Sequence, residues 1–226
     1  MAISISPVQP GDVDFLTRKV EYPAHLDGPL YRVMFPHSQK LRWEEEEDEI
    51  RWTADAILEA IHREDEVLYK ACGDDGLPVG LIGWTTSAGA SAEFIQGGRA
   101  VKPGVRKKRA GTAPPSTLDM NTLLAISKRL REERRRVLQS YYKNEMYRIT
   151  FKTVNPNHQR EGVGSTLMES FCRKVDESAA DAFVMSSPAA VRLYSRFRFK
   201  TVGTVETEQG TFTSMFRASV LPWKRL

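Results

Sequence analysis

The stretch of sequence with the clearest chemical potential runs from Val154 to Met168. It reads Val-Asn-Pro-Asn-His-Gln-Arg-Glu-Gly-Val-Gly-Ser-Thr-Leu-Met, which predicts a strand end, a turn, a glycine-bearing loop and a helix start. Backbone N–H groups at a helix start have no intrahelical partner and carry partial positive charge, so they suit a phosphate. Gly162 and Gly164 would let a ligand approach closely, and Arg160 would add a charged contact. The pattern is neither a Walker A loop nor a dinucleotide-binding fingerprint, and these residues alone also allow a tight turn with no ligand.

A second segment makes the first more informative. Ser187–Phe199 reads Ser-Pro-Ala-Ala-Val-Arg-Leu-Tyr-Ser-Arg-Phe-Arg-Phe. Together with Gln159-Arg-Glu-Gly-Val-Gly164, it resembles motifs A and B of the GCN5-related N-acetyltransferase (GNAT) superfamily. Those motifs are Gln/Arg-x-x-Gly-x-Gly/Ala, and a Leu-Tyr helix followed by a strand that opens with Gly-Phe. The resemblance covers about residues 146–216, and the chain as a whole is similar to uncharacterised members from filamentous fungi.

The resemblance implies an α/β fold with a mixed, mostly antiparallel central sheet, a splayed parallel strand pair and flanking helices. The splayed strands would be residues 146–154 and 182–186, and acetyl-CoA would lie between them as a cosubstrate. Its pantetheine arm would pair with free strand backbone, and its pyrophosphate would sit on amides of the glycine loop. The cofactor-binding residues implied in this way are Thr153, Val154, Gln159, Arg160, Glu161, Gly162, Val163, Gly164, Ser165 and Ser187.

Tyr194 is the catalytic residue that the resemblance implies. In the family, this tyrosine protonates or hydrogen-bonds the departing CoA thiolate. The alternative is a tyrosine packed on the sheet with its hydroxyl at the surface. Two positions depart from the family pattern: Arg198 replaces the usual glycine of motif B, and Ser187 stands where asparagine is common. Neither position carries out chemistry in the family, so the expected fold is unaffected.

The general base and the acceptor site are less defined. The strand 146–154 contains no carboxylate, so the base is an ordered water or one of three other glutamates, Glu145, Glu206 and Glu208. The acceptor pocket is expected between residues 22–38 and the last hairpin, around 206–210. Its polar candidates are His25, Asp27, Tyr31 and Arg32, each of which could equally be a solvated loop residue.

The elements that must position these residues follow from the hydrophobic pattern. Strands are expected at 3–8, 66–72, 78–85, 146–154, 182–186, 199–206 and 212–218. Helices are expected at 13–20, 39–62, from Thr117 or Asp119 to 143, 162–178 and 189–197. Residues 22–38 contain three prolines and a glycine, which predicts a loop with at most one helical turn around 30–35. The acidic run 44–49 lies near a helix start, where it suits the helix dipole.

Residues 86–116 have a different composition, rich in Gly, Ala, Ser, Pro and Arg. We expect a mobile basic insertion there, within a single domain that spans residues 1–226. Cations cluster at 99–109 and again at 128–136. Such clusters can bind nucleic acid or serve nuclear import, but the lack of interleaved aromatic residues favours solvated surfaces.

Composition excludes several classes of protein. The chain has 226 residues, 41% hydrophobic and 27% charged, which are values of a globular domain. No apolar run approaches the roughly 18 residues of a membrane helix, and the N-terminus does not resemble a secretory signal. Cys72 and Cys172 have no metal-ligand spacing and are expected in the core, so no metal site is predicted. A reducing compartment follows, cytoplasmic or alternatively nuclear.

These observations lead to one functional hypothesis and two alternatives. The first is an acetyl-CoA-dependent N-acetyltransferase in which an amine attacks directly, with a small-molecule amine as the acceptor. The second is a protein or histone lysine acetyltransferase. The third is a non-catalytic acyl-CoA-binding relative. Nucleic-acid and membrane partners are not expected, and a homodimer is left open.

Overall fold

The computed structural model describes residues 2–26, 28–36, 41–86, 113–141, 145–208 and 210–219. The strands are β1 (Ser4–Pro7), β2 (Glu66–Cys72), β3 (Pro78–Thr86), β4 (Met146–Val154), β5 (Asp181–Ser186), β6 (Lys200–Thr207) and β7 (Gly210–Arg217). The α-helices are α1 (Val13–Leu16), α2 (Tyr22–His25), α3 (Pro29–Met34), α4 (Trp43–Ile61), α6 (Met120–Tyr141), α7 (Val163–Glu177) and α8 (Val191–Arg196). Short 3-10 turns are η1 (Pro10–Asp12), η4 (Pro156–His158) and η5 (Pro188–Ala190), and one π-helical stretch is η2 (Thr17–Glu21).

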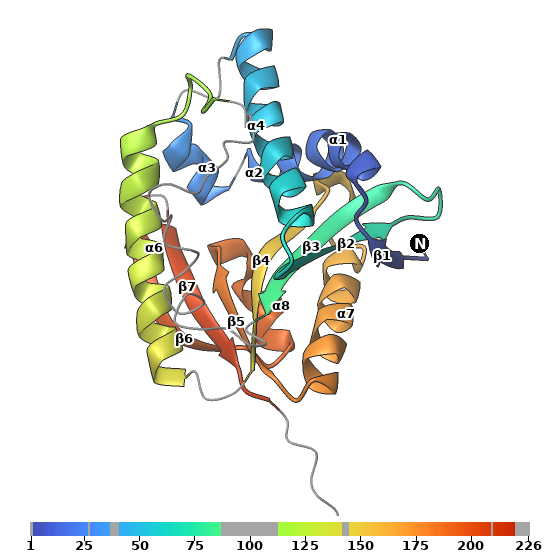
Figure 1. Cartoon of the computed structure of the whole chain (residues 1–226), viewed down its shortest axis with the longest axis vertical. Coiled ribbons are helices and arrows are strands. Elements are labelled where there is room, and N and C mark those ends of the chain that lie inside the picture. The colour runs from blue at the N-terminus through green and yellow to red at the C-terminus, as the bar shows by residue number, and fades with distance from the viewer. Residues whose placement is uncertain are drawn as a thin grey trace, which may run out of the picture.

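All seven strands form one twisted sheet in the order β1-β2-β3-β4-β5-β7-β6 (Figure 1). Neighbouring strands are antiparallel, except that β4 and β5 are parallel. A parallel pair requires a crossover connection, which α7 provides. The expected mixed, mostly antiparallel sheet with flanking helices is therefore confirmed.

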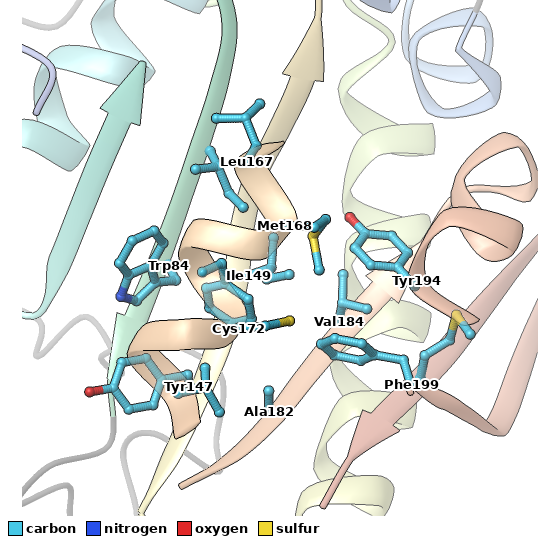
Figure 2. Packing of buried hydrophobic residues seen from close by; sticks show 14 of the residues in the cluster. Trp84, Tyr147, Ile149, Leu167, Met168, Cys172, Ala182, Val184, Tyr194 and Phe199 are labelled. Carbon is cyan, nitrogen blue, oxygen red and sulfur yellow. The ribbon is translucent and has the colours of Figure 1, made fainter. Parts of the chain in front are cut away.

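Each face of the sheet has its own hydrophobic core, because side chains alternate along a strand. On one face, Met168 of α7 and Tyr194 of α8 belong to one buried cluster with Ile149 and Trp84 (Figure 2). On the other face, α1 and α4 cover the β2–β3 side of the sheet, and α6 covers the β5–β7 side. The cysteines Cys72 and Cys172 are both buried and free, as expected from their spacing.

The helical turn expected around 30–35 coincides with α3, but residues 22–25 are helical too, so the loop expected over the rest of 22–38 was wrong there. It contains α2 and α3, and η2 joins α1 to α2 without a break. Pro29 stands in the first turn of α3, where its missing N–H costs nothing. Tyr22 and Tyr31 are buried and both donate hydrogen bonds to the buried Glu49 of α4, which ties these short helices to the long one.

The two longest helices, α4 and α6, each begin with an acidic side chain that accepts a hydrogen bond from a backbone amide of the first turn or its N-cap. Asp119 caps α6, because its carboxylate accepts a 3.0 Å hydrogen bond from the Thr122 amide. Thr117, the other predicted cap, instead donates to Glu49. At α4, Glu45 accepts a 2.9 Å bond from the Arg42 amide, and Glu47 pairs with Arg18 of η2. The acidic run therefore opens a helix, as expected, and also anchors it to the N-terminal helices.

Two arginines of the basic stretch 128–136 bind the outer strand of the sheet. Arg136 donates a 2.9 Å hydrogen bond to the Val202 carbonyl, and Arg129 donates a 2.6 Å bond to the Glu206 carbonyl. Both carbonyls belong to β6. The other basic stretch, 99–109, and most of the predicted insertion at 86–116 lie outside the described residues.

Candidate active site

The site begins where the parallel pair of strands separates. β5 pairs with β4 through Met146, Tyr147 and Arg148, and no further residue of β4 pairs with β5. β4 stays paired with β3 as far as Val154. The β5-facing edge of β4 is therefore open from Ile149 onward, which confirms the expected splay.

A β-bulge at the start of this gap changes which side chains of β4 face α7. Gly83 and Trp84 of β3 pair with Phe151 and Ile149 of β4, so Thr150 is an extra residue on β4. As a result, the side chains on the α7 face change from Tyr147 and Ile149 before the bulge to Lys152 and Val154 after it.

The same alternation decides which backbone groups of β4 are free. The Asn155 amide donates a 2.9 Å hydrogen bond to the Val79 carbonyl of the β3 side. In an antiparallel ladder, alternate residues direct both backbone groups to the same partner strand, so Thr153 also faces β3. The backbone groups of Lys152 and Val154 then face the gap. Of the two residues expected to pair with a pantetheine arm, Val154 is placed to do so, and Lys152 takes the place of Thr153.

The N-terminus of α7 lies at the open end of the gap. Gly162 precedes the helix with φ of 94°, in the left-handed region that favours glycine, and Arg160 has φ of 70°. No side chain caps α7. The amides of its first residues, Val163, Gly164 and Ser165, thus have no intrahelical acceptor and carry the positive end of the helix dipole. This arrangement can bind a phosphate.

The space in front of these amides can accommodate a ligand. A Cβ atom built on Gly164 would lie 3.4 Å from Leu193 Cδ2 and 3.7 Å from both Lys152 Nζ and Val154 Cγ2. Those are ordinary contacts, so the protein itself leaves room for a methyl group there. Gly164 therefore leaves open a space of about the size of a methyl group beside the first turn of α7.

Tyr194 is buried on α8 and contacts the ring of Phe199 at a centroid distance of 5.6 Å. Figure 2 shows its ring beside Met168 and Val184, with the oxygen turned toward the side of Met168. Only 4% of the residue is exposed, so its ring is packed in the core. Burial raises the pKa of Tyr194 above its ordinary value, which keeps the phenol protonated and able to donate a hydrogen bond.

Two groups beside β4 carried no sequence signal. The first is Lys152, whose Nζ lies 5.9 Å from the centroid of the Tyr194 ring. Burial lowers the pKa of Lys152 to about 8. A lysine within a strand of β-branched and aromatic residues predicts a solvent-exposed side chain. The bulge that turns Lys152 inward has no signature in the sequence.

The second group is the buried carboxylate of Glu21 on η2, which packs against β3 and β4. Glu21 Oε2 is buried with no hydrogen-bond partner, and Oε1 lies 3.4 Å from His25 Nε2. A π-helical stretch often marks a functional position. A buried carboxylate oxygen without a donor is a place where a ligand with N–H groups would be stabilised.

The remaining predicted residues fall into different places. Gln159, Arg160 and Glu161 are exposed on the loop before α7, where Glu161 contacts His158 at 3.1 Å. Ser187 begins η5 directly after β5, across the gap from β4.

Several acceptor and base candidates are not placed to act. Glu145 precedes the paired end of β4, where its carbonyl accepts from Asp181, and Glu206 and Glu208 are exposed. Tyr31 is committed to Glu49 and buried, whereas His25 lies beside Glu21. Asp27 lies outside the described residues.

Arg198, the substituted motif B glycine, has φ of 69°. This is the left-handed region, which explains why a glycine is usual at that position and identifies a point of backbone strain here.

Comparison with known proteins agrees with the geometry of the fold. A histone acetyltransferase HPA2 and related acetyltransferase from Corynebacterium glutamicum has a TM-score of 0.61 at 13% identity, with 99% of each chain covered. Drosophila melanogaster polyamine N-acetyltransferase has a TM-score of 0.56 at 13% identity, covering 96% of this chain and all of the other. The PaiA N-acetyltransferase from Thermoplasma acidophilum, solved with coenzyme A, has a TM-score of 0.51 at 13% identity and covers 96% and 99% of the two chains. At such identities the likeness shows a shared fold, that of the GNAT acetyltransferases.

The sequence carries the family signature in its C-terminal part. Residues 137–216 match the family profile described as an acetyltransferase (GNAT) domain, which includes β4, α7, β5 and α8. The match covers less than half of the chain, and within it the likeness is to an acetyltransferase (GNAT) domain. No relative among curated protein sequences matches the chain, and the expected likeness to filamentous fungal members finds no support.

Within the described residues, no cluster of three or more His, Cys, Asp or Glu side chains is arranged to hold a metal ion. None of the helices in the described part of the chain is long and apolar enough to cross a membrane.

Proposed function

We propose that this protein is an acetyl-CoA-dependent N-acetyltransferase whose acceptor is a small-molecule amine. The observation that carries the proposal is the open edge of β4 leading to the uncapped first turn of α7. The edge offers the backbone of Lys152 and Val154 to an extended arm, in the manner of an added strand. The helix start, beside the end of this edge, offers unpaired amides to a pyrophosphate.

In this proposal, the residues around α7 hold the nucleotide end of acetyl-CoA. The amides from Arg160 to Ser165 surround the pyrophosphate, and the Gln159 and Arg160 side chains are free to add contacts. Ser187, on the opposite side of the gap, is placed to contact the pantetheine arm. When bound, acetyl-CoA supplies a thioester, in which the acetyl carbonyl is activated by its sulfur leaving group.

The reaction requires no protein nucleophile. The amine nitrogen attacks the carbonyl carbon, and the negative charge that develops on oxygen is stabilised by an amide N–H of the splayed strand. The C–S bond then breaks and the thiolate leaves with the sulfur electrons. Tyr194 donates a hydrogen bond to this thiolate. Because burial raises the pKa of Tyr194, the phenol stabilises the thiolate better by hydrogen bonding than by complete proton transfer.

The acceptor amine is placed on the α1–α2 side of β4, beside Glu21. The unpartnered Oε2 of Glu21 would accept hydrogen bonds from an ammonium or amine, and an opposite charge there would offset the cost of burying the carboxylate. His25, half exposed and 3.4 Å from Glu21, connects this carboxylate to solvent and provides a route for the proton released by the amine. Glu21 thereby replaces Glu145, Glu206 and Glu208 as the candidate base.

Two measurements test this function. Thermal shift with acetyl-CoA and with CoA measures binding, and thiol release from acetyl-CoA against a panel of amines measures transfer. The panel includes polyamines, arylalkylamines, amino acids and a lysine peptide. We expect stabilisation by both ligands and thiol release with small amines. Binding without turnover on any amine would indicate a non-catalytic relative, and turnover restricted to the peptide would indicate a protein acetyltransferase.

Gly164→Glu provides the negative control for both assays. It would place a carboxylate in front of the α7 amides, where like charge opposes a pyrophosphate. We expect no stabilisation by acetyl-CoA in a variant that retains the helical circular-dichroism spectrum of the unmodified protein. Equal stabilisation of both proteins would remove the α7 cradle from the proposal.

A further inference from the structure

Lys152 occupies an unusual position in the gap. Its side chain leaves β4 on the α7 face and ends near the first turn of α7 and the Tyr194 ring of α8. Neither of these places a negatively charged side chain beside the ammonium. Nζ lies 3.7 Å from where a Cβ of Gly164 would stand, and 5.9 Å from the centroid of the Tyr194 ring. The ammonium therefore lies between the first turn of α7 and the body of α8, at the bottom of the proposed phosphate cradle.

This ammonium has no anionic partner among the described residues. No carboxylate of that part of the chain lies within ion-pair distance of Lys152, whereas Lys70, also partly buried, contacts Asp12 at 2.5 Å. Removing a lysine from water without a counter-charge is costly. Burial is the sole cause of the lowered pKa of Lys152, so no neighbouring carboxylate compensates for the cost. A bound anionic ligand would supply the negative charge that the protein itself does not place beside this lysine.

We propose that Lys152 is an anion-binding residue of the cofactor site, whose ammonium contacts the pyrophosphate of acetyl-CoA from the sheet side. The α7 amides contact the same pyrophosphate from the helix side. This inference rests on the proposed function, because it assumes that acetyl-CoA occupies the gap. The pyrophosphate is favoured over the thiolate because Nζ is directed at Gly164, in the first turn of α7, where the phosphate-binding amides lie.

Protonation provides a signature that a structural role of Lys152 would lack. In the free protein, Lys152 loses its proton as the pH rises through about 8. A bound pyrophosphate favours the ammonium and raises that pKa, so acetyl-CoA affinity is greatest below pH 8 and falls above it. For a bound-state pKa above 9, the affinity falls about five- to tenfold between pH 7 and pH 9. The other charged or titratable groups around the cradle are His158, Arg160 and Glu161 before α7, and Tyr194 on α8.

The test compares Lys152→Met with Lys174→Met. Methionine keeps the length of the side chain without the charge. Lys174 is an exposed lysine in the last turn of α7, so at pH 7 each variant removes one positive charge. Dissociation constants for acetyl-CoA and for S-acetylpantetheine, which lacks the pyrophosphate, are measured by calorimetry at pH 7 and pH 9. Circular dichroism verifies that each variant is folded.

We expect Lys152→Met to weaken acetyl-CoA binding at pH 7 by about 10- to 100-fold, the range for a charged hydrogen bond. It should leave S-acetylpantetheine binding unchanged and abolish the fall in affinity from pH 7 to pH 9. Lys174→Met should behave like the unmodified protein. Because these readouts compare three proteins that share the other titrating groups, a changed pH profile is attributable to Lys152.

Three outcomes would overturn the inference. Unchanged acetyl-CoA affinity and pH dependence in Lys152→Met would remove Lys152 from the site while leaving the proposed function intact. Equal weakening of acetyl-CoA and S-acetylpantetheine would place Lys152 at the thioester and not at the pyrophosphate. Absence of acetyl-CoA binding by the unmodified protein would overturn the proposed function together with this inference.

Discussion

Replacing Gly164 with alanine should stabilise the protein and weaken its binding of acetyl-CoA. The new Cβ would meet no atom closer than 3.4 Å, and Gly164 does not have a positive φ. Glycine in a helix costs up to about 1 kcal/mol relative to alanine, partly through the entropy of the unfolded chain. We therefore expect a gain of about 0.5–1 kcal/mol in the free energy of unfolding. For a chain of this size, that corresponds to a rise in Tm of about 1–4 °C.

The same methyl group should interfere with the ligand. It would project into the space bounded by Leu193, Lys152 and Val154, in front of the amides that bind the pyrophosphate in our proposal. Losing one charged hydrogen bond costs about 1.5–3 kcal/mol, which is a 10- to 150-fold rise in Kd. Unfolding by heat without ligand and calorimetric titration with acetyl-CoA measure the two effects on one protein preparation.

Gly80→Ala is the matched control, with the opposite expected sign on stability. A Cβ on Gly80 would lie 2.9 Å from Val163 Cγ1 and 3.0 Å from Leu167 Cδ1, so α7 would have to move away from β3. We expect a loss of about 1–3 kcal/mol from overpacking. Undiminished acetyl-CoA affinity in Gly164→Ala would refute the phosphate cradle. A loss of stability in Gly164→Ala would show that packing requires this glycine.

Three further substitutions separate catalysis, acceptor binding and backbone strain. Tyr194→Phe should lower kcat by about 10²-fold with an unchanged Kd for acetyl-CoA, because the hydroxyl acts only as the thiolate leaves. An unchanged kcat under conditions where chemistry limits the rate would remove Tyr194 from the mechanism. Glu21→Gln should lower kcat/KM for the best amine by at least about tenfold. Glu44→Gln, which changes an exposed acid of α4, should leave kcat/KM unchanged. Equal activity of the two variants would exclude Glu21 from the acceptor site. Arg198→Gly should raise the free energy of unfolding by about 0.5–1 kcal/mol, because it relieves a left-handed residue with φ of 69°; urea unfolding measures this, and a loss of stability would show that the arginine side chain outweighs the strain.

The elements around the glycine-bearing loop at 159–164 were predictable because local sequence signals and tertiary structure agree there. The strand 146–154, the helix that starts at Gly162 and the Leu-Tyr helix coincide closely with β4, α7 and α8. In each, the hydrophobic period and the flanking turn residues indicate the same element. The splay between β4 and β5 came from the family resemblance, since a local pattern does not report where two strands stop pairing.

Features that depend on three-dimensional context were missed. The prolines of residues 22–38 suggested a loop, but Pro23 and Pro29 stand in the first turns of α2 and α3, where proline is compatible with a helix. Buried aromatic side chains hold both helices in place. The inward position of Lys152 depends on the bulge at Thr150, and the burial of Glu21 depends on the packing of η2 on β4. Neither has a sequence signature, because both depend on contacts between segments that are distant in the sequence.

The arginines of α6 have a consequence for how copies of this protein can associate. An outer strand with free backbone groups is a template for pairing with another molecule, and β1 and β6 are the outer strands of this sheet. β1 is only four residues long and ends in Pro7, which has no amide proton. On β6, Arg129 and Arg136 engage the carbonyls of Glu206 and Val202 and bring positive charge beside that edge. Both edges are thereby protected against continuation of the sheet into a neighbour.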